Sequence, residues 1–165
     1  MPDSVTLGGE FTTSCWENGR LLWEDKFSNG ITAVGLLDVL NVMFRVSSQA
    51  AAWYIAPITL ISDVSSADTL ASHAGWTEVN ATYDEATRPA WSPPTASGGK
   101  LKNTTTTEFT FNASTVCDGL MIASDNVKGS AGANTLWCTG KFSTPRTFAA
   151  GQQLRVFYEL TATAV

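Results

Sequence analysis

The dipeptide Asn18-Gly19 constrains this chain more than any other local feature. It joins two strand-like runs within residues 10–27, which read EFTTSCWENGRLLWEDKF. A type I′ turn needs positive φ at both central residues, and Asn-Gly meets that need most readily. The segment therefore predicts a β-hairpin.

A two-residue turn also predicts the register of the hairpin. Counted outward from the turn, the expected pairs are Trp16 with Leu21, Cys15 with Leu22, and Ser14 with Trp23. Both faces near the turn then carry apolar groups, so we expect cover on two sides and some tendency to self-association.

The rest of the chain is also rich in strand patterns. Strand-like runs occupy residues 51–62, 76–83, 107–112, 117–124, 135–142 and 153–163, separated by clusters of Gly, Asn, Ser and Pro. With the hairpin this makes about eight strands, typical of two packed sheets in a sandwich or jelly roll. At 165 residues, one domain is expected.

One amphipathic helix is predicted over residues 33–44, with Thr32 as its N-cap. Its apolar residues recur at steps of three and four, at Val34, Leu37, Leu40 and Phe44. We expect Ser28-Asn29-Gly30 to form a turn before it. A single helical turn over residues 68–72, capped by Asp68, is a further expectation.

Three irregular features complete the outline. Residues 1–9 are expected to form an N-terminal arm. Residues 91–107, rich in Pro, Ser, Gly and Thr, predict a long surface loop that reaches a neighbour or is disordered. Pro57 lacks a backbone N–H and therefore indicates an edge or a bulge in its strand.

Charge and cysteine content narrow the classes of function. Fifteen acidic and ten basic residues give a net charge of −5 without any basic run, which disfavours a nucleic-acid partner. No apolar stretch approaches the roughly 18 residues that span a bilayer, and the start carries no leader pattern, so no membrane partner is expected. Cys15, Cys117 and Cys138 are interpreted as buried free thiols.

Residues that could carry chemistry have simpler structural interpretations. His73 is the only histidine, and we expect a loop residue bonded to backbone, beside Gly75, where the chain turns Trp76 into the core. Glu78, Asp84 and Glu85 could serve a glycosidase, or with Asp63 and Asp68 a calcium site, but are expected to be solvated acids. We expect no enzyme, no cofactor and no metal.

Six tryptophans exceed what a small core commonly needs, and Trp and Tyr are preferred anchors of interfaces. Charged residues make up only 15% of the chain, below the usual quarter, so its surface is less costly to desolvate against a protein. The candidate partner contacts are Trp53, Tyr54, Trp91, Pro93 and Pro94.

Four segments carry a resemblance to a known family. They read WEDKFSNGITAVGLLDVL (23–40), WYIAPITLISD (53–63), DTLASHAGWTEVNATYDEATRPAW (68–91) and TLWCTGKFSTPRTFAAGQQLRVFYELT (135–161). In order and spacing they resemble a family of small virion-associated structural proteins of tailed bacteriophages and prophages. Ala56-Pro57 departs from the Gly-Leu expected after Trp-Tyr-Ile.

The resemblance implies a capsid decoration, or cement, protein with a jelly-roll or sandwich fold, present in the virion. Its implied partners are the major capsid protein and copies of itself, as a dimer or trimer. A tail or neck component is an alternative. A β-sandwich carbohydrate-binding module, with Trp53, Trp76, Tyr83 and Trp91 as a stacking platform, is the alternative from another class.

Overall fold

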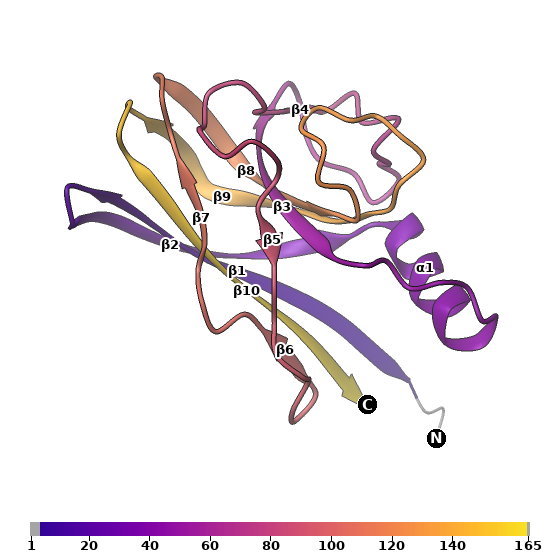
Figure 1. Ribbon diagram of the computed structural model, residues 1–165. Coiled ribbons are helices and arrows are strands. Elements are labelled where there is room, and N and C mark those ends of the chain that lie inside the picture. The colour runs from indigo at the N-terminus through magenta and orange to yellow at the C-terminus, as the bar shows by residue number, and fades with distance from the viewer. Residues whose placement is uncertain (1–3, 165) are drawn as a thin grey trace.

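The computed structural model describes residues 4–164, which form ten strands and one helix (Figure 1). The elements are β1 (Val5–Glu17), β2 (Arg20–Ile31), α1 (Ala33–Phe44), β3 (Trp53–Leu60), β4 (Trp76–Glu78), β5 (Ala90–Trp91), β6 (Lys100–Lys102), β7 (Thr107–Thr110), β8 (Thr115–Ala123), β9 (Leu136–Phe148) and β10 (Gln153–Ala164). The chain is mainly β and its arrangement is compatible with a sandwich, as the sequence predicted.

The strands hydrogen-bond in the order β4-β3-β8-β9-β2-β1-β10-β6, with β5 beside β3 and β7 beside β10. β2 joins the two halves of this order. Its residues 20–28 pair with β1, whereas residues 29–31 pair with residues 138–140 of β9. The first half comprises β6, β7, β10, β1 and β2, and the second comprises β9, β8, β3, β4 and β5.

The main core lies between the two halves. Phe11 and Tyr158 of the first half belong to the same buried cluster as Ile55 and Ile122 of the second. Alternation on β1 explains the contribution of the first half, because Phe11, Thr13 and Cys15 are buried while their neighbours are not. Aromatic side chains dominate this layer, with the Phe11 and Tyr158 ring centroids 4.7 Å apart.

The second half is buried on both faces. A smaller cluster on its far side includes Ala56, Trp76, Met121 and Leu136 of the strands and Leu70 of the segment between β3 and β4. Double burial accounts for the unbroken apolar runs at residues 53–58 of β3 and 119–123 of β8, which would alternate with polar residues if one face met water.

The predicted hairpin forms about Asn18 and Gly19, both with positive φ. Its predicted register holds only for Trp16 and Leu21. A bulge follows, and Cys15 pairs with Trp23 rather than with Leu22. The extra residue on β2 allows both Leu22 and Trp23 to pack against the core.

The helix has the predicted bounds and the predicted cap. The Gly35 N–H donates to the Thr32 hydroxyl at 3.0 Å.

The expectation that Ser28-Asn29-Gly30 forms a turn is wrong, because all three residues continue β2. The helical turn over residues 68–72 is also absent. The Asp68 carboxylate instead accepts from the Ser65 N–H and the Trp76 indole N–H.

The expected arm and loop are more ordered than the sequence suggested. Residues 1–3 lie outside the described part of the chain, and residues 5–9 are strand β1 paired with β10 rather than a free arm. Within residues 91–107, the end of β5, the whole of β6 and the start of β7 are strand. The expectation of an edge at Pro57 is wrong, since β3 has partners on both sides. Pro57 lies between the stretches that β4 and β5 pair, where its missing N–H breaks no ladder.

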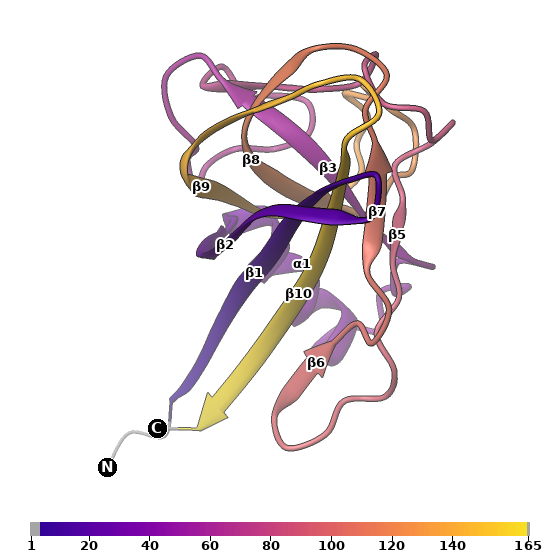
Figure 2. The ribbon, with the colours of Figure 1, turned by 90° about the vertical axis from the view of Figure 1, so that its left-hand side faces the viewer.

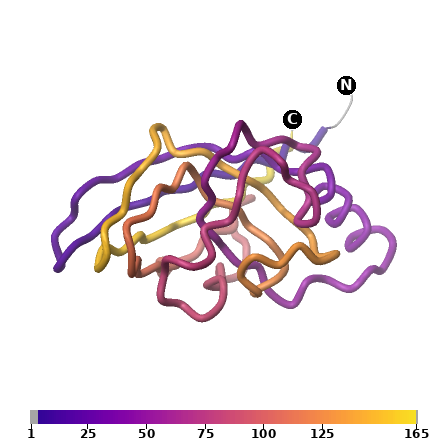
Figure 3. Tube along the Cα trace, turned by 90° about the horizontal axis from the view of Figure 1, so that it is seen from above, coloured from indigo at the N-terminus to yellow at the C-terminus, as the bar shows by residue number. Residues whose placement is uncertain are grey.

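The turn between β1 and β2 and the helix α1 lie at opposite ends of the molecule (Figures 1 and 3). β1 and β10 run side by side, and Val5 pairs with Ala164 (Figure 2). No helix in the described part of the chain is long and apolar enough to cross a membrane.

Candidate functional site

An apolar groove opens beside the helix, with a volume of about 550 Å³. Trp53 and Trp137 line it from one half of the fold, and Leu101 and Leu160 from the other. Its remaining lining residues are Asp38, Val39, Val42, Met43, Gln49, Ala50, Ala51, Ala52, Trp91, Ser92 and Pro93. Asp38 is the one charged residue among them. The volume of the groove and its mostly apolar lining suit the binding of an apolar group.

Three tryptophans give the groove a rigid wall. Trp53 pairs with Trp91 across β3 and β5, and its ring meets that of Trp137 edge to face at 6.1 Å. The Trp91 indole N–H donates to the Asn103 side-chain oxygen and to the Tyr158 carbonyl, both at 3.2 Å. The indole N–H of Trp91 is thereby satisfied inside the fold, and its ring, only 6% exposed, supports the wall of the groove from within.

The helix is fastened to β9 at its N-terminus. The Thr32 N–H donates to the Trp137 carbonyl at 3.0 Å, and the Thr32 hydroxyl contacts the Leu136 and Trp137 carbonyls. Gly35 is required here, since a Cβ at that position would lie 2.7 Å from the Trp137 carbonyl oxygen. This close approach fixes which side of α1 faces the protein.

The side of α1 that faces away from the protein is apolar throughout. Leu37 is 56% exposed, Leu40 54% and Phe44 74%, so three of the four residues of the predicted core-facing stripe lie on the surface. Val34 alone of the four packs against a buried cluster. Leu36 and Met43 are exposed beside them, and Val46, just past the helix end, is almost fully exposed with a φ of 59°.

The predicted partner contacts divide into two groups. Trp53, Trp91 and Pro93 line the groove, but Trp91 is buried and presents little surface of its own. Tyr54 is half-buried and Pro94 is exposed, and neither lines the groove. The sequence reasoning missed the helix face, because a stripe of apolar residues at helical spacing is normally assigned to the core.

Trp76 and Tyr83, which were considered as part of a sugar platform, are buried, at 1% and 2% exposure. With Trp91 also buried, these three cannot form an exposed aromatic row. Of the four residues of that platform, only Trp53 is more than slightly exposed, and it lines the groove.

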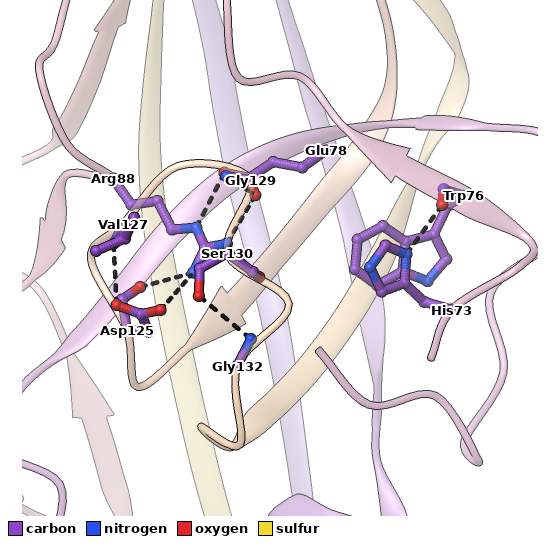
Figure 4. Close-up of polar contacts among 9 residues, drawn as sticks. All are labelled: His73, Trp76, Glu78, Arg88, Asp125, Val127, Gly129, Ser130 and Gly132. Atoms are coloured by element: carbon purple, nitrogen blue, oxygen red, sulfur yellow. Dashed lines mark hydrogen bonds and ion pairs between the residues drawn. The ribbon is translucent and has the colours of Figure 1, made fainter. Parts of the chain in front are cut away.

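His73 has the predicted structural role. Its ring stacks on Trp76 at 3.8 Å between centroids, and Nδ1 lies 3.0 Å from the Trp76 carbonyl oxygen (Figure 4). Gly75 allows a close approach of two backbone segments, since a Cβ there would overlap the Asp63 carbonyl.

The three carboxylates that were candidates for catalysis make structural contacts. The Glu78 carboxylate accepts two hydrogen bonds from Arg88, from Nε at 2.9 Å and from Nη2 at 2.7 Å (Figure 4). It also accepts one from the Gly129 N–H at 2.8 Å. Glu85 accepts from the Thr110 N–H, and Asp84 from the Asn112 side chain. Among residues 4–164, no three His, Cys, Asp or Glu side chains are grouped so as to hold a metal ion.

The cysteines are free and buried, as predicted. Burial raises the pKa of the Cys15 thiol to about 11 and that of Cys138 to about 12, because a thiolate is costly to desolvate. Burial raises the pKa of Cys117 as well. These thiols are therefore protonated and unreactive near neutral pH.

Comparison of the sequence with models of protein families and with curated proteins finds no match.

Proposed function

We propose that this chain is a bacteriophage virion structural protein of the capsid decoration type, which binds the assembled head and stabilises it. The observation that carries the proposal is the apolar end of the molecule, formed by the groove and the adjoining outward face of α1. An isolated monomer rarely exposes so much contiguous apolar surface, and such surface commonly marks a protein interface. The family resemblance supplies the virion as the location.

The groove is the part of this end that we assign to the major capsid protein. Its rigid aromatic wall suits an apolar side chain from a partner, since buried aromatic pockets are where interface energy concentrates. A protein that binds the assembled capsid lattice but not its free subunits stabilises the lattice alone. A partner held at a hundred times its dissociation constant contributes about 2.7 kcal/mol per site to the lattice that carries the site.

The test is to mix the purified protein with heads of the phage that encodes it, stripped of accessory proteins, and to image them by cryo-electron microscopy. We expect extra density at regular lattice positions. Bare heads would overturn the proposal and leave the tail or neck as the location to test next.

Two substitutions test whether the groove is the surface that contacts the capsid. Ala51 is exposed at the groove, so Ala51→Glu places a charge there without disturbing the core. We expect it to abolish head binding, because the new carboxylate has to be desolvated against the partner. Ala71→Glu, equally exposed but outside the groove, is the control and should bind as the unaltered protein does.

A further inference from the structure

The outward face of α1 contains no polar side chain. Six positions of the helix are exposed, and all six are apolar: Ala33, Leu36, Leu37, Leu40, Met43 and Phe44. The polar residues Asp38 and Asn41 are half-buried on the inward side. A surface helix normally has the opposite arrangement, with its polar side toward water.

The exposed area of this face approaches what a stable dimer requires. Its side chains expose on the order of 600 Å², whereas a stable interface buries roughly 800 Å² on each partner. Contact of two such faces, with modest additions from Val46 and the helix flanks, reaches that range. Val46 is 96% exposed and adjoins the face.

The order of the side chains suits a second copy of the same chain. A two-fold interface must be self-complementary, so that residue i meets residue j and residue j meets residue i. The exposed residues are symmetric about Leu40, with Leu37 and Met43 three positions away and Leu36 and Phe44 four. Two antiparallel helices that cross at Leu40 therefore place Leu36 of each copy against Phe44 of the other.

The charge distribution also permits a second copy. The chain carries a net charge of −5, which opposes close approach of two copies over most of their surface. Within α1 the only charged residue is Asp38, and Arg45 follows at the C-cap, so the helix region is neutral overall. In the antiparallel crossing, Asp38 is on the inward side of each helix and does not face the partner helix, so no like charges meet.

We propose that the protein forms a two-fold dimer in which α1 packs antiparallel against α1 of a second copy, crossing at Leu40. Of the four helix residues that line the groove, Asp38, Val39 and Val42 lie outside the exposed face and only Met43 belongs to both, so the groove of each copy adjoins the dimer interface. The inference specifies the self-association that the proposed function includes. Dimer formation can be tested in solution without heads, so its result is independent of the test for capsid binding.

The first experiment measures mass in solution by sedimentation equilibrium. We expect a dimer for the unaltered protein, and at least about 100-fold weaker association for Leu40→Lys, which brings two buried ammonium groups together at the two-fold axis. Ile61→Lys is the matched control, because Ile61 is 68% exposed and lies outside the helix, and it should remain dimeric. A monomeric unaltered protein, a trimer, or a Leu40→Lys variant that still dimerises would each overturn the proposal.

The second experiment tests the direction of packing by disulfide formation. An equimolar mixture of Leu36→Cys and Phe44→Cys proteins should cross-link under mild oxidation, whereas neither protein alone should. Self-cross-linking of each variant alone would instead show parallel helices and overturn the geometry. The native thiols do not interfere, since all three are buried. Denaturation curves of each variant confirm that the fold is intact.

Discussion

Arg88 offers the sharpest test of what holds this fold together. Its side chain is fully buried, and the guanidinium contacts both oxygens of Glu78, a carboxylate only 6% exposed. A third bond, from Nη1 to the Asp125 carbonyl at 2.8 Å, attaches the loop between β8 and β9 to Arg88 and, through Glu78, to β4. Replacement by methionine keeps most of the side-chain volume and removes all of these bonds.

The expected cost of Arg88→Met is about 3–5 kcal/mol, because Glu78 is left as a buried charge without its partner. For a domain of this size, each kcal/mol lowers the melting temperature by about 2–4 °C, so we expect a decrease of about 10 °C. Urea denaturation measures the free energy of unfolding directly.

The double variant Arg88→Met/Glu78→Gln separates the cost of the unpaired Glu78 charge from the cost of the lost hydrogen bonds. It removes the uncompensated charge, so it should regain part of the stability that Arg88→Met loses. Hydrogen exchange should meanwhile show the loop at residues 125–134 opening more often in both variants, since one of its anchors, the bond from the Arg88 side chain to the Asp125 carbonyl, is lost. A cost below about 1 kcal/mol for Arg88→Met, or a double variant no more stable than the single one, would refute the reasoning.

Three further predictions concern the helix, the hairpin and the thiols. Gly35→Ala should cost about 1–3 kcal/mol in thermal denaturation, because its Cβ would press on the Trp137 carbonyl, while Gly30→Ala, with nothing closer than 4.0 Å, should be nearly neutral. Gly19→Ala should cost about 1 kcal/mol in urea, since φ is 77° there and no atom lies within 4 Å; an unchanged midpoint would contradict the type I′ turn. Stability should fall as pH rises from 9 to about 11, because the Cys15 thiol ionises in the unfolded chain while its raised pKa keeps it protonated in the fold. Urea midpoints across this range should fall less steeply for Cys15→Ala, and equal slopes would count against the assignment.

Features set by a few neighbouring residues could be predicted from the sequence. The turn at Asn18 and Gly19 and the cap at Thr32 depend on local backbone preferences and on one short hydrogen bond. The helix consequently has the predicted bounds. That the three cysteines are free follows from their odd number and wide spacing, and their burial follows from the way a free Cys packs as a small hydrophobic residue.

Features set by distant partners could not be predicted. The apolar periodicity locates the stripe on α1 but does not show whether the stripe faces the core or the solvent. That orientation is determined by the contact between Gly35 and Trp137, which lies about a hundred residues later in the sequence. The bulge at Leu22 depends on Trp23 packing against Phe142 and Phe148. Trp91 is buried because Tyr158 accepts its N–H, a contact that no local pattern signals.

The shared strand β2 affects how the molecule would carry a mechanical force. α1 follows β2 after a single residue, so tension applied to the helix by a bound partner passes along the axis of β2. That strand is bonded to β1 over most of its length and to β9 at the end nearest the helix. Bonds perpendicular to the pull share the force and must break together, unlike bonds that open one by one from an end. Tension at the apolar end would therefore be resisted by both halves of the fold at once.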